Sequence, residues 1–130
     1  AKNKNGEQAF QKNYEMLDFL LSKYPEKFKD IINRKIKAPG DDGKIRYDTD
    51  LHYFITNQIE SIKIYQHMKR DSDYGMQIAA RMNRFLTLFF KAGAKFDIQD
   101  QDGKTALDYL RQYRTYMPAG CIPDEIIKLL

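Results

Sequence analysis

Apolar residues that recur with the period of an α-helix restrict the fold of this chain more than any other feature. The strongest case has the spacing i, i+4, i+7, i+8 and i+11, and consists of Ile78, Met82, Phe85, Leu86 and Phe89. Such spacing places the side chains on one face of a helix. Gly93 follows at a point where helices commonly end on a left-handed residue. We therefore predict an amphipathic helix that ends at this glycine.

The same period predicts helices elsewhere in the chain. An early apolar stripe comprises Phe10, Tyr14, Leu17, Leu21 and Tyr24. Pro25 then suits the first turn of a shorter helix, because proline has no amide hydrogen to leave unpaired there. Further helices are expected at about 50–68, 105–113 and 123–130. The segments 38–43 and 70–75 are expected to be loops, because they are rich in Gly, Asp and other polar residues.

Composition favours helices over a sheet. The aromatic residues, 13% of the chain, are all Tyr and Phe, and the sequence contains no Val. Strands are enriched in β-branched and aromatic residues, so the supply for an extended sheet is poor. With 42% hydrophobic residues the chain has enough apolar surface to fold. We expect an all-α protein of antiparallel helices.

Length and terminal composition suggest the domain organisation. A chain of 130 residues is expected to form a single domain, 1–130, with residues 1–6 as a polar, flexible tail. The missing initiator Met leaves open a processed chain or a fragment of a larger protein. No apolar run approaches the roughly 20 residues of a membrane helix, so we expect no membrane partner.

The charge distribution argues against nucleic acid as a partner. The net charge of +4 divides equally between the two halves of the chain, without a basic tail. The densest basic stretch, residues 23–37, also contains Glu26 and Asp30. A nucleic-acid surface normally carries one sign of charge. We interpret this stretch as a solvated helix face.

One longer motif is more specific. Between residues 88 and 107 three large apolar residues precede Gly93-Ala94, and Asp-x-x-Gly-x-Thr-x-Leu follows from residue 100. This arrangement resembles the ankyrin repeat without a gap, and the best match extends from Leu88 to Leu110. Gly93 and Gly103 can adopt the positive φ that a helix end and a hairpin turn require, and the Thr105 hydroxyl can cap the next helix.

Weaker echoes of the repeat occur at 49–52, 15–21 and 125–130. The interval from Thr49 to Thr105 is 56 residues, about 23 more than the 33 of an ankyrin repeat. The resemblance therefore implies an all-α solenoid, a short stack of about three degenerate helix pairs with enlarged helices or connections.

The resemblance also implies a function. Ankyrin repeats usually bind another protein through hairpin tips and the concave helix face. Carried over to this chain, the partner-binding positions in the matching repeat are Gln101, Asp102, Lys104, Gln112 and Tyr113. Thr56 and Asn57 are the equivalents in the weaker second repeat. The alternative for each is an ordinary surface residue. We expect a monomeric, cytoplasmic interaction module, or an effector secreted into a host cell.

Other chemistry has little support. A calcium loop centred on Gly103 would place Ile98 and Tyr109 where carboxylates are required, so no metal or cofactor is expected. His52 is expected to form a structural hydrogen bond near a helix start. A nucleophilic set of Cys121, His52 and an Asp has no recognised signature, so we predict no enzyme and no catalytic residue. Two alternatives stay open, a segment that packs on another domain of its parent chain and a small helical enzyme.

Overall fold

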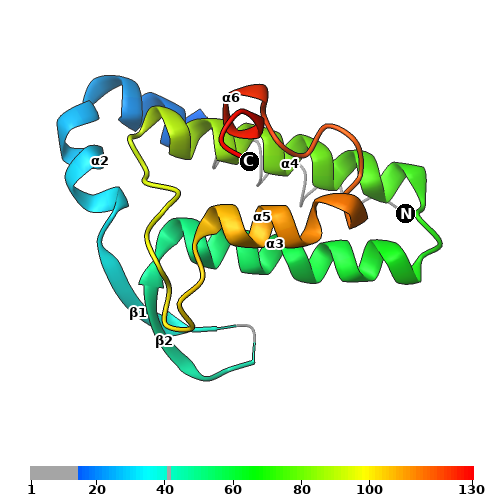
Figure 1. Ribbon diagram of the computed structural model, residues 1–130. Coiled ribbons are helices and arrows are strands. Elements are labelled where there is room, and N and C mark those ends of the chain that lie inside the picture. Colours follow the sequence, from blue (N-terminus) through cyan, green and yellow to red (C-terminus); the bar gives the residue numbers. More distant parts are fainter. Residues whose placement is uncertain (1–14, 41) are drawn as a thin grey trace.

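The computed structural model describes residues 15–40 and 42–130 (Figure 1). The predicted tail at 1–6 lies outside these residues, as do Phe10 and Tyr14 of the first apolar stripe. Residues 15–23 are helical and continue the stripe through Leu17 and Leu21. The remaining elements follow in the order α2 (Pro25–Ile32), β1 (Lys35–Pro39), β2 (Ile45–Thr49), α3 (Asp50–His67), α4 (Ser72–Lys91), α5 (Ala106–Tyr113), the 3-10 turn η1 (Arg114–Tyr116) and α6 (Asp124–Ile127).

The central pair of helices is α3 and α4, which run antiparallel along the length of the molecule (Figure 1). Helix α5 lies against α3. The core is a cluster of buried side chains from α3, α4, α5, α6 and the segments between them, formed by Leu51, Ile55, Ile59, Ile62, Ile78, Met82, Leu86, Phe96, Ala106, Tyr109, Leu110, Cys121, Ile122 and Ile126. The predicted stripe of α4 supplies three of these residues.

Side-chain caps fix where the long helices begin. The Thr49 hydroxyl accepts a hydrogen bond from the His52 amide at the start of α3. At α5, Thr105 and Asp108 form a reciprocal capping box, with bonds of 2.9 and 3.1 Å. This bonding to Thr105 lowers the pKa of Asp108. The predicted cap at Thr105 is confirmed, because its side chain satisfies an amide that the helix leaves unpaired.

The predicted loop at 70–75 is partly wrong, because α4 begins at Ser72. The Asp71 carboxylate accepts a hydrogen bond of 2.9 Å from the Tyr74 amide and caps the helix. The chain reverses before it at Lys69 and Arg70, which both have a positive φ. A polar stretch can therefore begin a helix when its first acidic residue is placed as a cap.

The expectation of an all-α fold is wrong. Strands β1 and β2 pair as an antiparallel sheet in which Lys37 lies opposite Tyr47. The predicted loop at 38–43 contains the end of β1 and the connection between the strands. A hairpin needs only local pairing, and most of its side chains are exposed. It therefore forms without the Val-rich sequence that a buried sheet would require.

The expectation of a solenoid of about three helix pairs is also wrong. Helices α3 and α4 have 18 and 20 residues, whereas α5 has eight and α6 has four. Helix α3 contacts both α4 and α5, which differ greatly in length. The helices are therefore not arranged as similar, repeated pairs. The extra residues between Thr49 and Thr105 lengthen α3 and α4 and do not form a further pair.

Within the part of the chain that the structure describes, no helix is both long and apolar enough to cross a membrane.

Replacing Leu110 tests how much the packing of α5 against the core contributes to the free energy of unfolding. The Leu110 side chain is fully buried, and Leu110→Ala should lower the free energy of unfolding by about 2–5 kcal/mol through lost contacts and a cavity. Leu129→Ala, at an exposed position, should change it by less than about 0.5 kcal/mol. Urea unfolding followed by circular dichroism measures both. Equal effects would contradict the described core.

Candidate functional site

A tight turn follows α4 and lies beside the hairpin (Figure 1). The Gly103 amide donates to the Asp100 carbonyl, and the Asp100 amide donates to the Lys104 carbonyl. One carboxylate oxygen of Asp100 accepts from the amides of Asp102 and Lys104, both at 2.9 Å. Gly103 has the positive φ of 79° that the motif predicts. The side chain of Asp100 thus holds its own turn closed.

A second buried carboxylate, that of Asp48, joins the turn to the hairpin. One of its oxygens accepts from the Gln101 amide at 2.8 Å, and the other accepts from Arg46 Nε at 2.8 Å. Gln101 Oε1 accepts in return from the Tyr47 amide at 3.1 Å. The Tyr47 amide lies on the edge of β2 that does not pair with β1, so the turn covers part of that edge.

Arg46 supplies the positive charge of this cluster. Its guanidinium contacts Asp48 and Asp102 at 2.8 and 2.9 Å and lies 3.8 Å from Asp100. The hydrogen bond with Asp48 is the main reason that the pKa of Arg46 is raised. The positive charge of Arg46 thereby compensates the negative charges of Asp48 in β2 and of Asp100 and Asp102 in the turn. The carboxylates of Asp48 and Asp100 are almost completely buried.

Tyr109 connects the cluster to α5. Its hydroxyl donates a hydrogen bond to the second carboxylate oxygen of Asp100, which is not the one that accepts from the two turn amides. Burial, followed by the hydrogen bond to Asp100, raises the pKa of Tyr109 far above the ordinary value of a phenol. The phenol therefore stays a proton donor, and α5 is tied to the same carboxylate that closes the turn.

The residues that lead into the hairpin are fixed as well. Asn33 Nδ2 donates to the Gly93 carbonyl at 3.0 Å, and Asn33 Oδ1 accepts from the Lys95 amide at 2.7 Å. A single side chain thus binds the backbone on both sides of residue 94. The segment that follows α4 is consequently attached both to the residue that precedes β1 and to strand β2.

Two surface hollows lie along this side of the molecule. The first, here called the polar hollow, has a volume of about 390 Å³ and is lined by Gly40, Asp42, Arg46, Thr56, Glu60, Asp102 and Tyr109. The second, here called the tyrosine hollow, has a volume of about 450 Å³ and is lined by Ile62, Lys63, Gln66, His67, Gln112, Tyr113 and Tyr116. The Tyr113 and Tyr116 rings are 6.5 Å apart.

Most of the predicted partner-binding residues lie at these hollows. Thr56 and Asp102 line the polar hollow, and Gln112 and Tyr113 line the tyrosine hollow. Lys104 lies between them, with its Nζ 3.0 Å from Gln112 Oε1 and 5.3 Å from the centre of the Tyr109 ring.

The other two predicted residues line neither hollow. Gln101 bonds the hairpin, so its backbone and side chain have a structural role. Asn57 is exposed elsewhere on α3. The prediction missed Arg46 and Glu60. Glu60 lies four residues after Thr56, which places both on one helix face, whereas nothing in the sequence indicated that Arg46 would meet Asp102.

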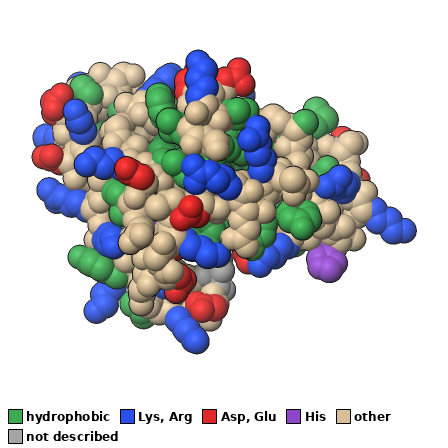
Figure 2. All heavy atoms as spheres, in the orientation of Figure 1, with side chains coloured by type: hydrophobic (Ala, Val, Ile, Leu, Met, Phe, Trp, Pro, Cys, Tyr) green, Lys and Arg blue, Asp and Glu red, His purple; other side chains and the backbone are tan. Residues whose placement is uncertain are grey.

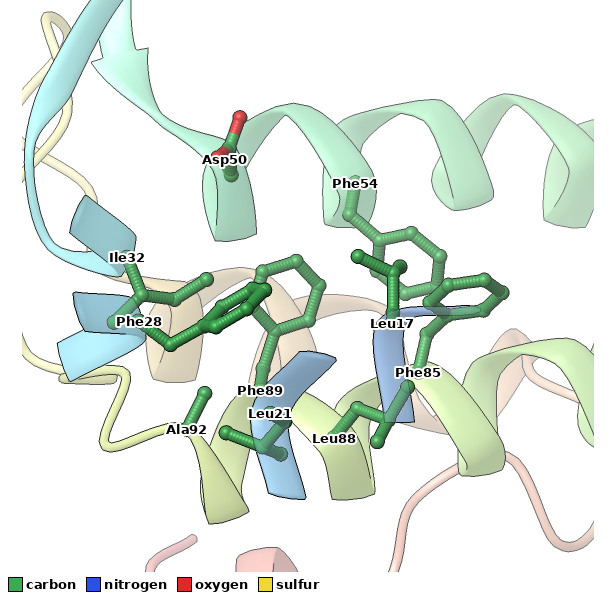
Figure 3. Close-up of a pocket in the computed structure, with 10 residues that line it drawn as sticks. All are labelled: Leu17, Leu21, Phe28, Ile32, Asp50, Phe54, Phe85, Leu88, Phe89 and Ala92. Carbon is green, nitrogen blue, oxygen red and sulfur yellow. The ribbon is translucent and has the colours of Figure 1, made fainter. Parts of the chain in front are cut away.

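A third hollow is apolar and lies between the N-terminal helices and the α3–α4 pair (Figure 3). It has a volume of about 280 Å³ and is lined by Leu17, Leu21, Phe28, Ile32, Asp50, Phe54, Phe85, Leu88, Phe89 and Ala92. Partial burial raises the pKa of Asp50, and Figure 3 shows its carboxylate directed away from the aromatic rings. The surface of this hollow therefore offers little polar chemistry.

The nucleophilic alternative gains no geometric support. Cys121 is buried, and its burial raises the pKa of the thiol to about 12. His52 Nδ1 lies 2.7 Å from Thr49 Oγ1, which confirms the predicted structural hydrogen bond at the helix start. Its buried Nε2 has no hydrogen-bond partner among the described residues. In residues 15–40 and 42–130, no group of three or more His, Cys, Asp or Glu side chains is arranged to hold a metal ion.

The link between the hairpin and the turn gives a prediction about stability. Asp48→Asn should lower the free energy of unfolding by about 3 kcal/mol, because it removes one member of a buried ion pair and leaves Arg46 facing an amide. The Asp48 side chain is 3% exposed, whereas that of Asp102 is 60% exposed. Asp102→Asn should therefore cost about 1 kcal/mol or less. Urea titration of both variants checks the difference, and similar losses would contradict it.

The burial of Cys121 predicts slow thiol chemistry. At pH 8 a disulfide reagent such as DTNB should modify the native protein at least about 100-fold more slowly than the protein in concentrated urea, because thiolate is scarce and access is blocked. Absorbance of the released thionitrobenzoate measures the rate. Fast, complete modification of the native protein would contradict the burial of this residue.

No protein family model, no curated protein and no solved structure matches this chain. The resemblance to ankyrin repeats therefore stays a prediction.

Proposed function

We propose that this chain is a non-catalytic module that binds another protein through the side formed by the hairpin, α3 and α5. The observation that carries the proposal is the pairing of two hollows along α3 and α5, the polar hollow and the tyrosine hollow. Lys104, which bonds Gln112 and lies over Tyr109, joins them. Together the hollows make one face, which we call the binding face.

Rigidity supports this proposal. The segments beside the binding face are held by side-chain hydrogen bonds, from Asn33 before β1 and from Asp48 and Arg46 in β2. The Tyr53 hydroxyl adds a contact of 2.8 Å to the Arg46 carbonyl. A surface that is ordered before binding loses less conformational entropy when a partner docks.

The chemistry of the binding face varies along its length. The polar hollow is lined by the carboxylates of Asp42, Glu60 and Asp102 around Arg46. The opposite end offers Tyr113 and Tyr116. Tyrosines are frequent anchors in protein interfaces, because their rings bury area while their hydroxyls stay paired. Mixed charge and tyrosines fit a folded protein partner better than a nucleic acid.

We further propose the cytosol, of the protein's own cell or of a host cell, as the setting, and a monomer as the acting form. The free thiol of Cys121 fits a reducing compartment. The proposal assigns no catalytic role, and the thiol of Cys121 is buried and lies outside both hollows.

An affinity experiment tests the binding face. The face variant combines Glu60→Ala, Gln112→Ala and Tyr113→Ala, and the control variant combines Met76→Ala and Lys91→Ala on α4. Proteins captured from native lysate are quantified by mass spectrometry, and the affinity of the enriched partner is then measured with purified components. We expect the wild type and the control variant to bind the same partner, and the face variant to bind it at least about tenfold more weakly.

Circular dichroism must show that all three proteins are folded. If the face variant and the wild type bind an identified partner equally well, the binding face is wrong. If no protein is enriched over an unrelated domain of similar charge, the interaction function itself is contradicted for that cell type.

A further inference from the structure

The net charge of the molecule is concentrated in one short segment. Residues 23–37 contain six Lys and Arg and two Asp and Glu, a net charge of +4 that equals the charge of the whole chain. The rest of the sequence sums to zero, with a net charge of −2 in the remainder of residues 1–65 and +2 in residues 66–130. This segment comprises α2, β1 and the residues between them. Figure 2 shows Lys and Arg side chains along the side of the molecule that Figure 1 assigns to α2 and the hairpin.

Exposed apolar side chains are interspersed with these cations. Phe19 is 61% exposed and Ile31 is 52% exposed, and Met16 and Tyr24 from the same stretch of the chain are exposed as well. A group of exposed apolar side chains is more informative than a single one. Phe19 and Lys23 lie on the helix at 15–23, and Lys27 and Ile31 lie on α2, with Tyr24 between the two helices. We call the whole exposed set the α2 patch; it consists of Met16, Phe19, Lys23, Tyr24, Lys27 and Ile31.

The cations and the aromatic rings of the α2 patch are in direct contact. Lys23 Nζ lies 5.6 Å from the ring centres of both Phe19 and Tyr24, and Lys27 Nζ lies 5.5 Å from that of Tyr24. The ammonium groups of both lysines thus lie over the aromatic rings of the patch. Apolar groups and positive charge therefore face solvent together on one surface.

We propose that the α2 patch binds the surface of a bilayer that contains anionic lipid. Apolar side chains of an amphipathic helix enter the boundary between headgroups and acyl chains, and neighbouring lysines contact the anionic headgroups. Phe19 and Ile31 take the first role, and Lys23 and Lys27 take the second. Contact with one leaflet requires no membrane-spanning helix.

The same features disfavour nucleic acid. Bases stack on free aromatic faces, whereas Lys23 and Lys27 already occupy faces of Phe19 and Tyr24. Exposed aliphatic side chains such as Ile31 have no role against a phosphate backbone. The α2 patch shares no residue with the binding face, so this inference goes beyond the proposed function, and either can fail without the other.

Sedimentation with vesicles tests the proposal on the full chain. One set of vesicles contains about 30% phosphatidylserine in phosphatidylcholine, a composition chosen to give the negative surface of a cytoplasmic leaflet, and the other contains phosphatidylcholine alone. We expect binding to the first set only, weakened by salt. Lys23→Gln with Lys27→Gln should weaken binding about 30-fold, at roughly a fivefold loss for each cation. Phe19→Ser with Ile31→Ser should weaken it about tenfold or more.

Matched substitutions outside the patch serve as controls. Met76 is 70% exposed on α4, and Met76→Ser should leave vesicle binding unchanged. Lys91→Gln with Lys128→Gln removes the same charge as the lysine variant but from other surfaces. Circular dichroism confirms that each variant is folded. If the double variant Phe19→Ser with Ile31→Ser loses helicity, Ile31→Ser alone takes its place, because Ile31 is exposed.

Three results would overturn the proposal. The first is no binding to the phosphatidylserine vesicles. The second is an equal loss of binding in the control and patch variants. The third is tight binding to polyglutamate or RNA that depends on Lys23 and Lys27 but not on Phe19 and Ile31, because the surface would then recognise an acidic macromolecule and not lipid.

Discussion

The buried carboxylate of Asp48 is the contact on which the arrangement of the loops depends. It binds Arg46 in its own strand and the Gln101 amide in the turn after α4. A buried carboxylate without partners would be strongly unfavourable, so the hairpin and the turn must lie together for either to be stable. Asp100 extends the network to Tyr109 in α5. A few charges thus connect segments that are about fifty residues apart in the sequence.

Helix α3 connects the hairpin that contains Asp48 to the hydrophobic core. Its cap, Thr49, is the last residue of β2, so the hairpin leads directly into the helix. Its buried face packs against α4 and α5, and its exposed side supplies Thr56 and Glu60 to the polar hollow and Lys63 and His67 to the tyrosine hollow. One helix therefore positions both hollows, and the distance between them is set by helical geometry.

Local features were predictable and long-range ones were not. The caps at Thr105 and Gly93 act within one or two turns, so the sequence contains all their partners. The hairpin was missed because the composition argument concerned buried sheets, although the Gly- and Asp-rich loop between two short alternating segments was a usable signal. Gln101 was expected to face a partner, but its neighbours Tyr47 and Asp48 belong to a distant segment and use it for the fold.

The sequence by itself determined the long helices α3 and α4, the cap at Thr105 and the buried stripe of α4, because periodicity and capping are short-range properties. It also contained the lysines and apolar residues of the α2 patch, although their common surface depends on how two helices meet at Tyr24. Only the tertiary structure decided that β2 would meet the turn after α4, and that α3 would be flanked by helices of unequal length. Those outcomes depend on burying charges and apolar surface between distant segments, and that free energy exists only once the chain has closed on itself.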